Sequence, residues 1–176
     1  MRPVLARLLT AVAAAALLGL APGCTTQPGL TCPGQRVASL AMQGALDAGA
    51  TGCATPPPGG WSVKPAISFD ADFTWEEALG RLDYCSGGFH AAPLYGTRSG
   101  DHLRVEGAVP GAVLAACGAT CTPRMALVIE GDLSPAAQGA VTFAGTLTET
   151  FDDSAGGCGA CVLPCTSTYD LSGVSR

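Results

Sequence analysis

Three stretches of the chain, HLRVEGAV (residues 102–109), ALVIEGDL (126–133) and AVTFAGTL (140–147), repeat one pattern. Every second position is occupied in turn by two large apolar residues, a glycine and another large apolar residue, and part of the pattern returns in TYDLSG (168–173). Alternation with a period of two is typical of a strand that buries one face. The repeat therefore predicts a set of β-strands around a common interior.

The glycine in each repeat needs a structural explanation, because glycine weakens a strand unless a bulky neighbour fills the space or the strand bends there. Trp61, Trp75 and Tyr84 are candidates to fill that space. We interpret the glycines as marks of close approach or curvature. The alternative is that the glycine row opens a ligand cavity.

Outward from the repeats, residues 67–73 (ISFDADF) alternate in the same way and predict another strand. Two short helices are predicted. One spans about 36–48, from apolar residues at helical spacing, and the other spans about 75–83, after the capping box Thr74-x-x-Glu77. The predicted fold class is mainly β: a disulfide-braced antiparallel β-sandwich or small β-barrel with one or two short helices, forming a single domain over residues 36–176.

The N-terminus has the features of an export signal. Arg2 and Arg7 precede an apolar run over residues 8–20, and Pro22-Gly23-Cys24 ends it. A basic start, an apolar core of this length and a small-residue exit describe a secretory signal peptide, while a membrane span needs about 20 apolar residues. We predict a signal peptide over residues 1–23.

The exit sequence Leu20-Ala21-Pro22-Gly23-Cys24 resembles the lipobox of bacterial lipoproteins. The resemblance implies cleavage before Cys24 and acylation of its thiol by chains such as palmitate, so that residues 24–35 form a lipid-anchored tether. Thr25 stands where many family members retained at the inner membrane carry Asp, which implies sorting to the outer membrane. Ordinary signal cleavage is the alternative, since Ala21-x-Gly23 also fits the small-x-small rule.

The charge balance limits the partners of the mature chain. Removing residues 1–23 leaves seven basic residues against 14 acidic ones, a net charge of −7. Nucleic-acid binding depends on clustered Lys and Arg contacts with phosphates. We therefore expect no nucleic-acid partner, and the protein or small-molecule partner stays unidentified.

Nine cysteines are an odd number for an exported protein. Assigning Cys24 to the lipid leaves eight, enough for four disulfides. Spacing suggests Cys32–Cys53 as a local pair and Cys85 with a member of the C-terminal cluster, whereas Cys117 and Cys121 either pair locally or each reach that cluster. The predicted disulfide cysteines are Cys32, Cys53, Cys85, Cys117, Cys121, Cys158, Cys161 and Cys165.

Two other roles for these thiols have to be weighed. The pairs Cys117-x3-Cys121 and Cys158-x2-Cys161 supply four thiolates for a tetrahedral zinc, and Cys158-Gly159-Ala160-Cys161 matches a redox C-x-x-C. Exported thiols meet an oxidising compartment, and the run after Cys161 does not look helical. We predict structural disulfides, with no metal and no cofactor.

Catalytic residues are hard to identify. His90 and His102 are the only histidines, and the chain contains no Gly-x-Ser-x-Gly elbow. Asp70 and Asp72 share one strand face about 7 Å apart, a spacing that suits paired carboxylates but also a solvated outer face. Asp152-Asp153 before a Gly-rich run is a weak Ca²⁺ motif or an acidic turn. We expect no enzyme, although a hydrolase stays open.

Gly59-x-Trp61 ahead of a strand resembles the start of the lipocalins, β-barrels that carry small apolar ligands. The sequence therefore supports two hypotheses about the exported domain. The first is a non-catalytic binding or structural module of the cell envelope. The second is a lipocalin-like carrier of a small apolar ligand, which an apolar cavity would favour and a filled interior would disfavour.

Overall fold

The computed structural model describes residues 32–49, 53, 63–86, 93–110, 113–115, 117–153 and 156–176. The predicted signal peptide, Cys24 and most of the tether lie outside the described residues, as do Gly59, Trp61 and His90. The elements are β1 (Gln35–Leu46), β2 (Ala66–Glu76), β3 (Arg81–Cys85), β4 (Leu94–Ser99), β5 (His102–Pro110), β6 (Arg124–Pro135), the 3₁₀ turn η1 (Ala137–Gly139), β7 (Val141–Asp152) and β8 (Cys165–Ser175).

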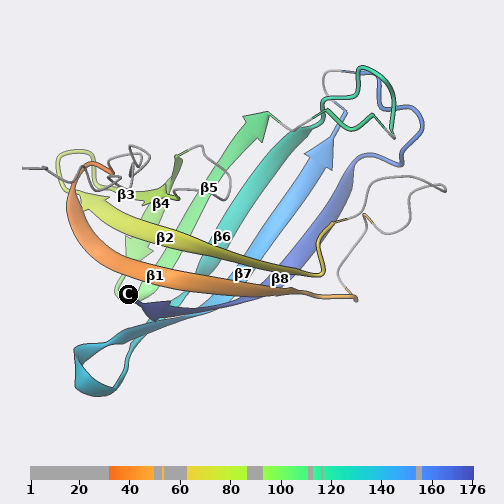
Figure 1. Ribbon diagram of the computed structural model, residues 1–176. Helices are drawn as coiled ribbons and strands as arrows, with labels where there is room; N and C mark the ends of the chain where they lie inside the picture. Colours follow the sequence, from red (N-terminus) through yellow and green to blue (C-terminus); the bar gives the residue numbers. More distant parts are fainter. Residues whose placement is uncertain are drawn as a thin grey trace, which may run out of the picture.

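The eight strands form a closed antiparallel barrel in the order of the chain (Figure 1). Each strand pairs with the next, and β1 closes the barrel against β8 from Leu40↔Ser175 to Leu46↔Tyr169. The longest ladder joins β6 to β7, where Gly131 pairs with Gly145 in the middle of two of the repeats. The prediction of a mainly β, disulfide-braced antiparallel domain is confirmed, and its architecture is the barrel.

Both predicted helices are wrong. Residues 36–48 lie mostly in β1, where Ala38, Leu40 and Met42 alternate inward and are buried. Small Ala and Gly residues are compatible with both the helical and the strand period, so the apolar spacing of this segment resembles that of a helix face. Residues 75–83 contain the end of β2, a turn and the start of β3. The Thr74 hydroxyl does not cap a helix but donates to the Pro33 carbonyl oxygen at 2.6 Å.

The interior is made by the alternating residues that the repeats identified. Phe73 lies in this interior, with its ring centroid 5.5 Å from that of Tyr84 and 6.2 Å from that of Phe143. All three side chains are almost completely buried. Burial of this apolar surface is the main driving force for the fold.

The repeated glycines are places of close approach. A Cβ on Gly145 would lie 2.2 Å from the Glu130 carbonyl oxygen, and one on Gly131 would lie 2.6 Å from the Phe143 ring. At Gly173 the nearest atom is the sulfur of Met42, at 2.5 Å. The predicted reason for these glycines is confirmed, but the neighbouring side chains are Phe143 and Met42 rather than Trp75 or Tyr84.

The two ends of the barrel differ. At one end, the connections after β2, β4 and β6 contain only two to five residues. At the other end, the connections span residues 47–65, 86–93, 111–123 and 153–164. We call these the turn end and the loop end. Figure 1 shows the β5–β6 and β7–β8 connections projecting together from the loop end, far from the β2–β3 turn.

Candidate binding end of the barrel

Three of the four disulfides brace the loop end. Cys53, in the β1–β2 connection, is bonded to Cys165 at the start of β8. Cys117–Cys161 and Cys121–Cys158 join the β5–β6 connection to the β7–β8 connection. Long connections on a rigid scaffold are where binding residues concentrate. Cross-linking fixes the geometry of such a surface before any partner arrives.

The two cross-linked connections form a unit that we call the disulfide cap, residues 113–121 and 156–163. Three of its cysteines are buried against one another. The Ala160 amide donates to the Cys117 carbonyl at 3.1 Å. The backbones also meet at Gly118, φ +151°, where a Cβ would lie 2.0 Å from the Gly157 carbonyl oxygen. The cap therefore packs as a small second core.

The surface of the cap carries two apolar side chains in solvent. Val162 is 88% exposed and Val113 is 59% exposed. Isolated exposed apolar residues are ordinary on protein surfaces. Here both belong to connections that two disulfides join.

The loop end of the interior contains a polar group that the sequence did not single out. Glu149 is only 5% exposed and faces inward between Leu147 and Phe151, opposite the buried Ser167 on β8. The Tyr169 hydroxyl donates to the Lys64 carbonyl at 3.0 Å. Burial raises the pKa of Tyr169 to about 12, and the Glu149 charge adds to this shift. The period of two that runs through Phe143 and Leu147 already places Glu149 on the inner face.

The disulfide pattern corrects two predictions. Cys32 is bonded to Cys85, not to Cys53, and Cys85 does not reach the C-terminal cluster. The alternative in which Cys117 and Cys121 each reach that cluster is confirmed. Spacing failed because residues 32–34 lie across β2 next to β3, whereas Cys53 lies next to the start of β8.

The disulfide pattern is incompatible with both the zinc-site and the redox C-x-x-C interpretation of the cysteines. Cys158 and Cys161 are bonded to different partners, so they do not form the disulfide of a C-x-x-C site. The four thiols proposed for zinc are all consumed in disulfides. Among the described residues, no group of His, Cys, Asp and Glu side chains is arranged to hold a metal ion.

His102 lies in a surface ion network rather than beside a nucleophile. Its Nδ1 is 2.9 Å from the Asp132 carboxylate and its Nε2 is 3.3 Å from the Glu130 carboxylate. The hydrogen bond to Asp132 is the main reason why the pKa of His102 is raised. Arg104 bonds Glu130 as well, and the same contact lowers the pKa of that carboxyl. With both ring nitrogens occupied, His102 has no free nitrogen to act as a base on a serine.

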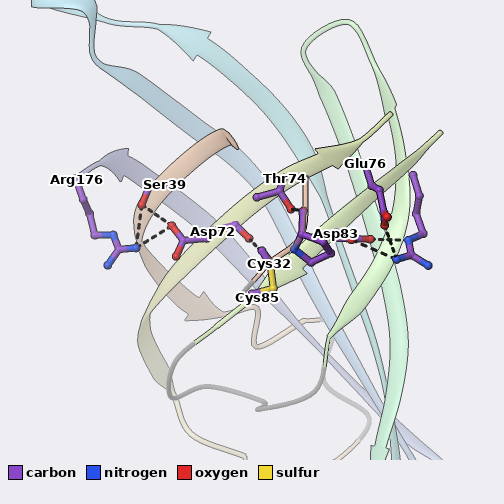
Figure 2. Close-up of a disulfide and its surroundings, with 10 residues drawn as sticks. Cys32, Ser39, Asp72, Thr74, Glu76, Asp83, Cys85 and Arg176 are labelled. Atoms are coloured by element: carbon purple, nitrogen blue, oxygen red, sulfur yellow. Dashed lines mark hydrogen bonds and ion pairs between the residues drawn. A yellow bond between two sulfur atoms is a disulfide. The ribbon is translucent and has the colours of Figure 1, made fainter. Parts of the chain in front are cut away.

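Asp70 and Asp72 are on the outer face of β2. Arg176 bridges them, with 2.8 Å between its Nη1 and Asp70 and 3.0 Å between its Nη2 and Asp72. Ser39 donates a hydrogen bond to Asp72 as well (Figure 2). The pair therefore holds the end of β8 against β1 and β2. Its solvated position matches the outer-face interpretation.

The Asp152-Asp153 motif is a turn that supports the cap. The amide of Gly156 donates to the Asp153 carbonyl at 3.0 Å, and the amide of Cys158 donates to the Asp153 carboxylate at 3.3 Å. One carboxylate oxygen is thus used to fix the chain next to a disulfide. This arrangement matches the acidic turn rather than a Ca²⁺ loop.

Among the described residues, one hollow of about 470 Å³ lies over β1, β2 and β8, with Gln43, Ser68 and Asp170 in its lining. A second, about 250 Å³, is lined by Trp75, Arg98 and Gly100 near the turn end. Neither of these two hollows has Phe73 or Phe143 in its lining.

No family model, curated protein or solved structure matches this chain. In the described part of the chain, no helix has the length and apolar character that crossing a bilayer requires. The fold itself has the strand number and up-and-down strand order that occur in lipocalins. A fold of this kind hosts many functions, so the site has to carry the functional argument.

Proposed function

We propose that this chain is an exported envelope lipoprotein, attached to the outer membrane through acyl chains on Cys24. The observation that carries the proposal is the pairing of cysteines. Eight of the nine cysteines are bonded to one another in four disulfides, which leaves Cys24 without an intrachain partner. A thiol left over at the end of a lipobox-like exit sequence is accounted for by lipid.

The same bonds support the proposed compartment. Disulfides persist in oxidising environments and are rare where cellular thiols keep cysteines reduced. Four of them in a domain of this size support export through the predicted signal peptide. The charged outer wall, with Arg104 and Arg176 in ion pairs, supports a barrel that stays outside the hydrocarbon core of the membrane.

The anchor is tested by following lipid on the native chain expressed in a Gram-negative host. Labelled palmitate should enter the wild type and the Thr26→Ala control, and it should be absent from Cys24→Ala. The intact mass should show an acylated N-terminus at Cys24 and no free thiol. A palmitate-free mature chain that begins at Cys24 would contradict the anchor while leaving export intact.

The barrel itself is proposed as a non-catalytic binding or structural module that meets its partner at the loop end. Braced long connections and the exposed Val113 and Val162 of the disulfide cap support contact with another molecule there. Both ring nitrogens of His102 contact carboxylates, which supports a non-catalytic role for this histidine. Net negative charge, with three of the arginines in ion pairs, supports the absence of a nucleic-acid partner.

A carrier of a small apolar ligand is the second candidate. It is favoured by the eight-stranded up-and-down barrel, since the mouths of such barrels are common ligand sites, and by the polar group at the loop end of the interior. Glu149 and Tyr169 would then orient the ligand. The rings of Phe73, Tyr84 and Phe143 pack against one another in the interior, which supports the module over the carrier.

A further inference from the structure

The described chain begins on the outer wall of the barrel, not at one of its ends. Cys32 is bonded to Cys85 at the end of β3, and the Pro33 carbonyl accepts the Thr74 hydroxyl on β2 (Figure 2). Gly34, at φ +94°, fits against β2 so closely that a Cβ would lie 2.4 Å from the Trp75 carbonyl oxygen. Residues 32–34 are therefore fastened across β2 toward β3.

This fastening shortens any tether. The lipid-anchored tether was predicted to run over residues 24–35, but the last of those residues are held on the barrel. Eight residue steps separate Cys24 from Cys32, and a fully extended chain of that length reaches at most about 28 Å. An acylated Cys24 therefore keeps the wall around Cys32 and Cys85 within that distance of the membrane.

Two of the largest exposed apolar side chains lie on the same wall. Leu79, 60% exposed, is in the β2–β3 turn, and Tyr95, 42% exposed, is on β4. Tyr95 pairs with Asp83, two residues before the bonded Cys85. The guanidinium of Arg81 lies 4.1 Å from the centroid of the Tyr95 ring. Tyrosine with a nearby cation suits the boundary between headgroups and acyl chains, where one end of the side chain is apolar and the other is hydrated.

We propose that the outer wall of β2, β3 and β4 lies against the bilayer, with Leu79 and Tyr95 at the level of the lipid headgroups and the disulfide cap pointing away from the membrane. The inference rests on the proposed lipid anchor at Cys24. Glu76 and Asp83 on this wall are held by Arg81 at 3.0 and 2.6 Å, so they are partly neutralised where the surface approaches lipid. Asp70 and Asp72, farther along the outer face of β2, are likewise paired with Arg176. Glu77, in the same turn, stays in the hydrated headgroup layer.

The apolar residues of the disulfide cap are the competing membrane contact. Val162 is more exposed than Leu79, and Val113 is almost as exposed as Leu79. They lie at the loop end, whereas the β2–β3 turn lies at the opposite end of the barrel (Figure 1). A short tether fastened on β2 and β3 cannot bring both the β2–β4 wall and the disulfide cap to the membrane at once. Measuring how deeply each surface lies in the bilayer therefore distinguishes the two orientations.

The test uses the full acylated chain in vesicles of phosphatidylethanolamine and phosphatidylglycerol. Leu79→Trp and Tyr95→Trp place a reporter on the proposed wall, and Val162→Trp places one on the cap. Quenching by bromine-labelled lipids is measured for each, and the quenching of the parent protein is subtracted. We expect clear quenching for the two wall reporters and none for the cap reporter.

Cap quenching that equals or exceeds wall quenching, or no added quenching at any site in chains that float with the vesicles, would overturn this orientation and leave the anchor intact. Chains that do not float with vesicles at all would instead overturn the anchor, and the orientation with it. Intact masses showing four disulfides in every variant establish that each reporter sits on the folded barrel. Opening the tether with Cys32→Ala/Cys85→Ala should then reduce the wall quenching, because the fastening to β2 and β3 is weakened.

Discussion

At the scale of single residues, the fold depends on a few contacts between glycine backbone and large side chains. Gly131 and Gly145 lie opposite each other on β6 and β7, and the Phe143 ring covers the first of them. A side chain at either position would meet backbone atoms, which cannot rotate away. The glycines therefore select the curvature of the barrel, and Phe143 fills the space that this curvature leaves.

Gly145→Ala should destabilise the domain because its Cβ would lie 2.2 Å from the Glu130 carbonyl oxygen. Overpacking of this kind costs about 1–3 kcal/mol in the free energy of unfolding. The midpoint of urea unfolding measures it. Gly159→Ala is the matched control, since a Cβ there has no heavy atom within 4 Å and should leave the midpoint unchanged. Equal midpoints for both variants would refute the close-approach argument.

His102 should make stability depend weakly on pH. Its pKa is raised in the folded state, mainly by Asp132. The favourable contact is therefore fully present below the unfolded pKa of about 6.5 and is lost as the pH rises through the higher folded value. We expect the difference in stability between wild type and His102→Gln to shrink as the pH rises from about 6 to about 8. Asp132→Asn should make this stability difference depend less on pH. A stability difference between wild type and His102→Gln that grows with pH would show that these carboxylates do not hold the ring.

At the scale of elements, the disulfide cap should behave as a unit separate from the barrel. Cys117–Cys161 and Cys121–Cys158 both join the same two connections, and neither touches a strand pairing. Removing one disulfide typically costs about 2–4 kcal/mol. The double variant Cys117→Ala/Cys161→Ala should lose stability of that order while hydrogen exchange in β6 and β7 stays slow. Fast exchange throughout the barrel would show that the cap is part of the main core.

The strands could be predicted from the sequence where large residues alternate, as in β5, β6 and β7. β1 could not, because Ala38, Ala41 and Ala45 carry little information about which face is buried. The end of β2 was misread because Thr74 and Glu77 have the spacing of a capping box, yet the Thr74 hydroxyl is used by Pro33. A local motif was overruled by a contact with a segment 41 residues away in sequence.

The candidate site was harder to anticipate than the fold. That four disulfides form follows from counting cysteines, but the partners depend on which connections meet at the loop end. The polar group around Glu149 needed only the period of two to be continued past Leu147. The position of Leu79 and Tyr95 relative to Cys32 could not be derived without the barrel. Leu79 lies in a turn within the range predicted as a helix, and Tyr95 lies in a strand that the sequence pattern did not predict.

At the scale of the whole molecule, the proposed attachment and the proposed contact surface lie at different places on the barrel. The chain enters over β2 and β3, the short turns lie at one end, and the braced connections lie at the other. If the interior is solid, the barrel is a rigid spacer that presents the disulfide cap. If the interior holds a ligand, the loop end is its mouth. The packing of Phe143 against Phe73 decides between these two uses.

Phe143→Ala should convert a filled interior into one that binds an apolar probe. Deleting a buried phenylalanine costs about 3–5 kcal/mol and leaves an apolar space that benzene can enter. We expect benzene to raise the melting temperature of Phe143→Ala but not that of the wild type or of the surface control Val162→Ala. A comparable rise in the wild type would show that space for an apolar ligand already exists beside Phe73, and the carrier would then replace the module as the better account of the barrel.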